Sequence, residues 1–145
     1  MIKDLQNTLK DAESEDIEIR RIAIDYLSDL LYSKSLEVSE VFTIVNFIYN
    51  RVAIEPSNSL REELLHAVIY GMSNYDLSDR KVQWLHLSQY VSLFSGEVLA
   101  HTLVLLGGSK LRQYIPLLER YTHDSNEIIA QAAQEALVEL QASTK

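Results

Sequence analysis

Cysteine is absent from this 145-residue chain, and glycine and proline are scarce, with four and two residues. Without cysteine the chain has no disulfide framework, no thiolate zinc site and no cysteine nucleophile. The scarcity of glycine and proline disfavours a β protein, since such folds need turn residues every few positions. These absences favour a helical fold.

Long hydrophobic runs are missing as well. No apolar run approaches the ~20 residues that a membrane-spanning helix requires, and residues 1–6 lack the basic-then-apolar layout of a secretion signal. We therefore expect a cytoplasmic protein without a membrane partner. Hydrophobic residues make up 47% and charged residues 23% of the chain, a globular composition, and the length suits a single domain over residues 1–145.

The charge is negative and unevenly distributed. The net charge is −8 with a pI near 4.9. Residues 1–40 hold ten acids and five bases (net −5), whereas residues 77–121 hold three acids and five bases (net +2). An acidic protein repels phosphate backbones, which argues against a nucleic-acid partner, and its acidic part attracts a basic protein. A purely solubilising role of these acids is the alternative.

The apolar spacing is helical along most of the chain. In residues 17–31, apolar side chains at steps of three and four predict one buried stripe, made by Ile19, Ala23, Tyr26, Leu27 and Leu30. A second stripe near the other end is made by Ile129, Ala132, Ala133, Ala136, Leu137 and Leu140. No stretch alternates with a period of two, so the pattern predicts an all-α fold.

Helix boundaries are marked by capping residues. Ser14-Glu15-Asp16 precedes one helix, Ser59-Leu60-Arg61-Glu62 has capping-box spacing, and Asp124-Ser125-Asn126-Glu127 has the same shape with an aspartate cap. Gly107-Gly108-Ser109 is typical of a helix C-terminus. The breaks predict eight helices in four antiparallel pairs, at residues 2–12 and 15–32, 38–53 and 59–73, 78–94 and 96–106, and 109–122 and 125–141.

Three segments of the chain resemble the HEAT-repeat family. Residues 106–118 resemble the first half of a HEAT repeat, in which a Leu-Gly ending is followed by Ile-Pro-x-Leu in the next helix. Residues 124–137 are similar to its acid-rich turn and alanine-rich second helix. Residues 16–27 are similar to that same second half, 110 residues earlier. The resemblance implies a right-handed α-α superhelix of about four stacked HEAT-like helix pairs, a fold that serves many functions.

The sequence contains no recognisable metal-binding or catalytic motif. The four histidines, His66, His86, His101 and His123, are never paired at the i, i+4 spacing that places two metal ligands on one helix face. The serines mostly precede helices, and no Gly-x-Ser-x-Gly or phosphate-binding loop is present. We expect no catalytic residue, no metal and no cofactor.

The aromatic residues are mostly tyrosine. Tyr26, Tyr90 and Tyr121 fall on apolar stripes and are expected in the core, and Trp84 is expected to pack. For Tyr70 a core position and an exposed anchor for a partner remain equal alternatives.

The strongest functional pattern lies on the second helix of each pair. In a stack of helix pairs these helices line the concave surface, where repeat proteins commonly bind partners. Most of the positions outside the apolar stripe there are acidic or polar, and a solvated charged face is the alternative reading. The candidate partner-binding residues are Glu18, Arg21, Asp25, Asp29, Glu62, Glu63, His66, Tyr70, Glu97, His101, Gln131 and Glu135.

The leading hypothesis is a non-catalytic protein-binding module, most specifically an acidic immunity protein (an antitoxin) that binds and neutralises a basic, nuclease-type bacterial toxin as a monomer or 1:1 heterodimer. One alternative is an enzyme or enzyme subunit of the HEAT-like bilin-lyase or DNA-glycosylase type. Its basic residues would be Arg80, Lys81, Lys110, Arg112 and Arg120, near Trp84. The other is an oligomerising scaffold with an apolar N-terminal end, Met1, Ile2 and Leu5.

Overall fold

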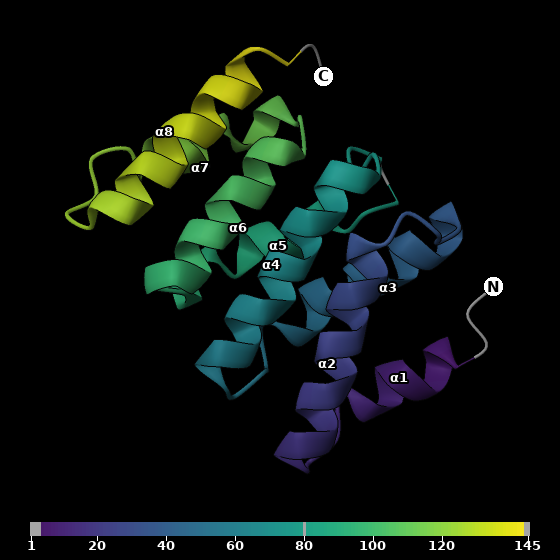
Figure 1. The fold of residues 1–145 in the computed structure, drawn as a ribbon. Coiled ribbons are helices and arrows are strands. Elements are labelled where there is room, and N and C mark those ends of the chain that lie inside the picture. Colours follow the sequence, from purple (N-terminus) through teal and green to yellow (C-terminus); the bar gives the residue numbers. More distant parts are fainter. Residues whose placement is uncertain (1–3, 80, 144–145) are drawn as a thin grey trace. The chain divides into compact units, whose positions relative to one another are not determined.

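The computed structural model describes residues 4–79 and 81–143, and within these residues every regular element is helical. The prediction of an all-α fold is therefore confirmed. None of the described helices is long and apolar enough to cross a bilayer. The elements are α1 (Leu5–Asp11), α2 (Ile17–Tyr32), α3 (Val38–Arg51), α4 (Asn58–Asn74), α5 (Trp84–Gln89), the 3₁₀ turn η1 (Val91–Leu93), α6 (Gly96–Gly108), η2 (Arg112–Tyr114), α7 (Ile115–Glu119) and α8 (Glu127–Gln141) (Figure 1).

The chain forms two compact units, residues 1–76 and residues 77–145. The first unit contains α1 to α4 and the second contains α5 to α8. The expectations of a single domain over residues 1–145 and of one four-pair superhelix stay predictions.

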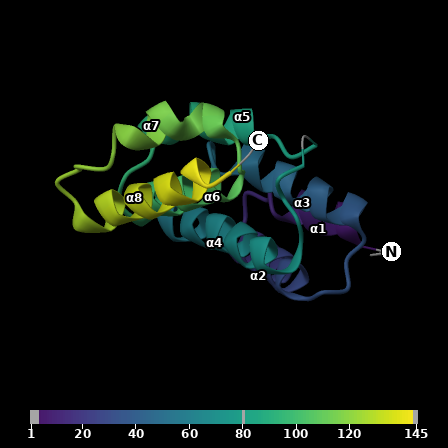
Figure 2. The same cartoon turned by 90° about the horizontal axis from the view of Figure 1, so that it is seen from above.

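In the first unit, α2 and α4 lie side by side and run in the same direction (Figures 1 and 2). A Cβ built on Gly71 of α4 would lie 3.6 Å from Leu31 of α2, an ordinary packing distance. The side-chain amide of Asn74 donates to the carbonyl oxygens of Leu31 and Tyr32, at 3.1 and 2.7 Å. These bonds satisfy carbonyls at the C-terminal end of α2 that have no partner within the helix.

The buried stripe of α2 differs in part from the predicted one. Ala23, Leu27 and Leu30 are buried as predicted, but Ile19 and Tyr26 are 44% and 42% exposed, so their assignment to the core was wrong. The core side of α2 instead includes Arg20. The buried positions run from Arg20 to Leu31 along one stripe, and Ile19 and Tyr26 lie at the edge of that stripe.

Helix starts follow the predicted chemistry with shifted positions. Asp16 caps α2 and accepts from the backbone N–H groups of Glu18 and Ile19. The predicted capping box at Ser59 was wrong, because Ser57 caps α4 and accepts from the N–H of Leu60 at 3.3 Å. In the same way, Asn126 rather than Asp124 caps α8. At the starts of α4 and α8, two nearby side chains have an oxygen that could cap the helix. The one directly before the first helical residue is the cap.

The third and fourth pairs have shorter first helices than predicted. Instead of a helix over residues 78–94, the second unit has α5 and η1, and instead of residues 109–122 it has η2 and α7. The N–H of Lys81 donates to the carboxylate of Asp79 and the indole N–H of Trp84 donates to the carbonyl of Leu77, at 2.8 and 3.0 Å. Both bonds stabilise a turn in place of helix.

The second unit is built around the packing of α8 on α6. A Cβ built on Gly107 would lie 2.7 Å from both Cα and Cβ of Ala136, so the two backbones approach closely because each position is small. The stripe predicted on α8 is confirmed at Ile129, Ala132, Ala133, Ala136 and Leu140, and Leu137 is half-buried. The predicted helix end near residues 107–109 is also confirmed, with the positive φ of 60° at Lys110 rather than at a glycine.

Candidate functional site

Three carboxylates gather where α2 and α4 meet at the surface of the first unit. Asp25 and Asp29 are exposed on α2, and Glu63 is half-buried on α4. The pKa of Glu63 is raised to about 8, mainly by burial and also by a hydrogen bond to Asp25 and by the charges of Asp25 and Asp29, while the charge of Arg21 lowers it. At neutral pH, Glu63 therefore mostly keeps a proton and shares it with Asp25.

Aromatic side chains continue this surface toward the C-terminal ends of the two helices. The ring of Tyr70 lies 4.5 Å from that of His66 and 5.4 Å from that of Tyr32, which it meets edge to face. Tyr70 and Tyr32 are both exposed, by 37% and 68%. Tyr70 is therefore exposed and not in the core, and its role as an anchor for a partner stays a prediction. We call this surface the α2/α4 face, defined by Arg21, Asp25, Asp29, Tyr32, Glu63, His66 and Tyr70.

Six of the twelve predicted site residues belong to the α2/α4 face. Glu18 lies next to it and forms an exposed ion pair with Arg21 at 2.8 Å. Glu62 is half-buried on α4. The remaining four predicted residues lie in the second unit. Glu97 and His101 are on α6 and Gln131 and Glu135 on α8, where the amide of Gln131 donates to Glu135 at 3.1 Å.

Tyr32, the last residue of α2, was not among the predicted site residues. The signal that could have found it is the spacing from Asp25 and Asp29, which places Tyr32 on the same side of the helix.

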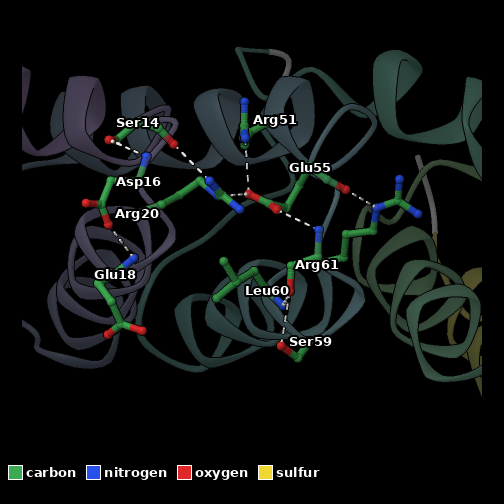
Figure 3. A network of polar contacts seen from close by, with 10 residues as sticks. Ser14, Asp16, Glu18, Arg20, Arg51, Glu55, Ser59, Leu60 and Arg61 are labelled. Carbon is green, nitrogen blue, oxygen red and sulfur yellow. Dashed lines mark hydrogen bonds and ion pairs between the residues drawn. The ribbon is translucent and has the colours of Figure 1, made fainter.

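A buried ion-pair network holds the first unit in shape at the other end of these helices (Figure 3). Glu55, in the loop between α3 and α4, is fully buried. Its carboxylate lies 2.8 Å from Nε of Arg20 and 3.2 Å from a guanidinium nitrogen of Arg51. The second carboxylate oxygen accepts from the backbone N–H of Ser57 at 2.8 Å. One carboxylate therefore links α2, α3 and the start of α4.

Two further hydrogen bonds extend this network to the backbone. Arg20 donates to the carbonyl oxygen of Ser14 in the turn before α2, at 2.8 Å, and Arg61 donates to the carbonyl oxygen of Glu55, at 2.6 Å. Sequence reasoning assigned no role to Arg20 or Glu55. The available signal was an arginine on the apolar side of α2, because a buried charge needs a buried partner.

The basic residues considered for a DNA-binding alternative lie in the second unit. Trp84 is 2% exposed, which confirms its packing role. Arg112 donates to the carbonyl oxygens of Leu140, Gln141 and Ser143, at 3.5, 3.0 and 3.3 Å, and so caps the C-terminal end of α8. Arg80 lies outside the described residues. The contacts of Trp84 and Arg112 are structural and give the DNA-binding alternative no support.

The three tyrosines expected in the core are not fully buried. Tyr90 and Tyr121 are both half-buried, whereas Tyr26 is exposed.

Across residues 4–79 and 81–143, no three His, Asp or Glu side chains gather closely enough to hold a metal ion.

Comparison with protein-family models, with curated proteins and with solved structures found no match to this chain.

Proposed function

We propose that this chain is a non-catalytic protein-binding module whose α2/α4 face binds a basic protein surface. The observation that carries the proposal is the gathering of Asp25, Asp29 and Glu63 beside exposed aromatic rings on two packed, parallel helices. The same proposal includes the finer architecture, a right-handed superhelix of about four HEAT-like helix pairs, supported by the paired second helices within each unit.

The chemistry of the α2/α4 face suits lysine and arginine side chains. Carboxylates on rigid helices attract cations from a distance and form charge-assisted hydrogen bonds on contact. Exposed tyrosine rings add cation–π contacts and a large contact area at a small entropic cost. Arg21 is the one cation within this face, and its pairing with Glu18 reduces its repulsion of a cationic partner.

The most specific form of the proposal is an immunity protein for a basic, nuclease-type toxin. A toxin that binds nucleic acid presents cations spaced to meet phosphates, and carboxylates held on a helical frame can take the place of those phosphates. The net charge of −8 on only 145 residues supports this reading, because long-range attraction speeds the encounter.

The test compares two variants of equal net charge. The site variant carries Asp25→Asn, Asp29→Asn and Glu63→Gln. The control variant carries Glu127→Gln and Glu139→Gln, two acids of the second unit outside the predicted site, because Glu63 is mostly protonated at neutral pH and Glu63→Gln removes little charge. Proteins captured from the native host at low and at high salt are identified, and the affinity of each is then measured. We expect a basic partner whose affinity falls with salt and falls at least tenfold in the site variant only.

Loss of affinity to the same extent in both variants would show that net charge, not the α2/α4 face, attracts the partner. An acidic partner, or an affinity insensitive to salt, would contradict the electrostatic proposal. If the partner is a nuclease, its inhibition by the chain tests the immunity function directly, and a partner whose nuclease activity is unaffected by bound chain would contradict that form of the proposal.

A further inference from the structure

A groove between α1 and α2 is lined mostly by apolar side chains. Its volume is about 300 Å³, and Ile19, Ile22, Ala23 and Tyr26 of α2 line it together with Thr8 and Asp11 of α1. Ile22 is the most exposed of these apolar side chains, at 68%. Ile19, Ile22 and Tyr26 follow one another at steps of three and four, so they form one continuous stripe along the helix.

The same positions are covered on α8, whose sequence is similar to that of α2. Counted from the first helical residue, Ile22 and Tyr26 are the sixth and tenth residues of α2, and Ala132 and Ala136 are the sixth and tenth of α8. Ala132 and Ala136 are only 7% and 2% exposed, and Ala136 lies directly against Gly107 of α6. On α4, the tenth residue is Ala67, which is also buried.

On α8 both positions are therefore small and buried, and Ala136 lies against another helix. On α4 the tenth residue is buried as well, whereas the sixth is the half-buried Glu63. On α2 the two positions are the larger Ile22 and Tyr26, and among the described residues no helix covers them. A face of this shape fits an α-helix better than an extended peptide, because a ridge of side chains along one helix fits the groove of another.

The borders of the groove are acidic. Asp11 lines it from α1. On α2, Glu18 is four residues before Ile22 and Asp25 three residues after it, and Asp29 is three residues after Tyr26, so these carboxylates border the stripe. Arg21 neutralises Glu18, which leaves Asp11, Asp25 and Asp29. A second copy of this chain would bring the same acids to the contact and be repelled.

From this geometry we infer that the α1/α2 groove binds an amphipathic helix of another protein, with its apolar stripe against Ile19, Ile22 and Tyr26 and with lysine or arginine on its flanks. This surface is separate from the aromatic part of the α2/α4 face, and the inference goes beyond the proposed function because it would stand even if Tyr70 and Glu63 contacted no partner.

The experiment uses the whole chain and two fluorescently labelled 18-residue peptides of leucine and lysine. One peptide has helical spacing of the leucines, and the other has the same composition in scrambled order. Binding is followed by fluorescence anisotropy near physiological salt. We expect the spaced peptide to bind at least tenfold more tightly than the scrambled one, since only its leucines can enter the groove together.

Matched variants locate the binding site. Ile22→Gln removes the most exposed apolar side chain of the stripe and leaves the charges and the α2/α4 face intact. Val138→Gln is the control, because Val138 is equally exposed, at 67%, on α8. We expect Ile22→Gln to reduce the affinity for the spaced peptide about tenfold and Val138→Gln to leave it unchanged.

Three results would overturn the inference: equal affinity for the two peptides, equal effects of the two variants, or self-association of the chain that Ile22→Gln abolishes. The last result, seen by sedimentation velocity, would assign the groove to a second copy. Failure of this inference can be told apart from failure of the proposed function. The proposed function is tested by substituting Glu63 and its neighbours and measuring affinity for the native partner, whereas this inference is tested by substituting Ile22 and measuring affinity for the peptide.

Discussion

The two units hold their neighbouring helices together in different ways. In the first unit, a buried carboxylate with two arginines links α2 to the start of α4, and the surface between these helices carries charges and aromatic rings. In the second unit, α6 and α8 meet through glycine and alanine, with no charge at the closest approach. A polar link holds helices while leaving charged side chains at the surface, whereas close contact of small residues leaves no room for side chains between the backbones.

The sharpest way to break this comparison is to remove the buried carboxylate. Glu55→Ala leaves Arg20 and Arg51 without their common partner in a buried site. We expect a loss of about 3–5 kcal/mol in the free energy of unfolding, because an uncompensated buried charge is costly. Urea denaturation followed by circular dichroism measures it. Arg21→Gln, which breaks only the exposed pair with Glu18, is the control and should cost about 0.5 kcal/mol or less. Similar losses in the two variants would show that the Glu55 network contributes little.

The close contact in the second unit is tested by a pair of glycine substitutions. Gly107→Ala would place a methyl group 2.7 Å from Ala136, and we expect it to cost about 1–3 kcal/mol. Gly71→Ala meets Leu31 at 3.6 Å, so it should be neutral or stabilise α4 by up to about 1 kcal/mol through helix propensity. Thermal unfolding of both variants gives the comparison. A neutral Gly107→Ala would mean that α6 and α8 separate easily.

The smallest expected effect concerns the proton on Glu63. The folded state raises its pKa from 4.5 to about 8, so the folded chain binds this proton more tightly than the unfolded chain does. Stability from this group is therefore present at low pH and is lost as the pH rises from about 4.5 to about 8. Solvent screens this half-buried group, so we expect a loss of roughly 1 kcal/mol.

Glu63→Gln should remove this part of the pH dependence, because glutamine imitates the protonated acid at every pH. Denaturation at pH 5, 7 and 9 measures it, and Glu62→Gln, at the adjacent position, serves as the control that keeps it. An unchanged pH profile in Glu63→Gln would show that folding does not raise the pKa of Glu63.

The candidate site was predictable from sequence to the extent that it depends on helix periodicity. Asp25, Asp29 and Glu63 lie off the apolar stripes, and spacing alone identified them as surface residues. The contact between these carboxyl groups was not predictable from spacing. It depends on the parallel packing of α2 and α4, which brings Asp25 within hydrogen-bonding distance of Glu63.

The wrong core assignment on α2 has a tertiary cause. Ile19 and Tyr26 were expected in the core because apolar residues at helical spacing usually face inward. In the structure they are exposed, and Arg20 is buried against Glu55. A partner 35 residues away along the chain leaves no trace in local periodicity.

By itself, the sequence determined the helical class, the approximate places of most helices in the described residues and the apolar stripe of α8, because all of these follow from interactions within a few residues. Only the tertiary structure decided which side of α2 is buried, which carboxylates meet and which apolar side chains remain exposed beside α1. Those outcomes depend on the neighbouring helices, since a side chain is buried or charged according to what packs against it.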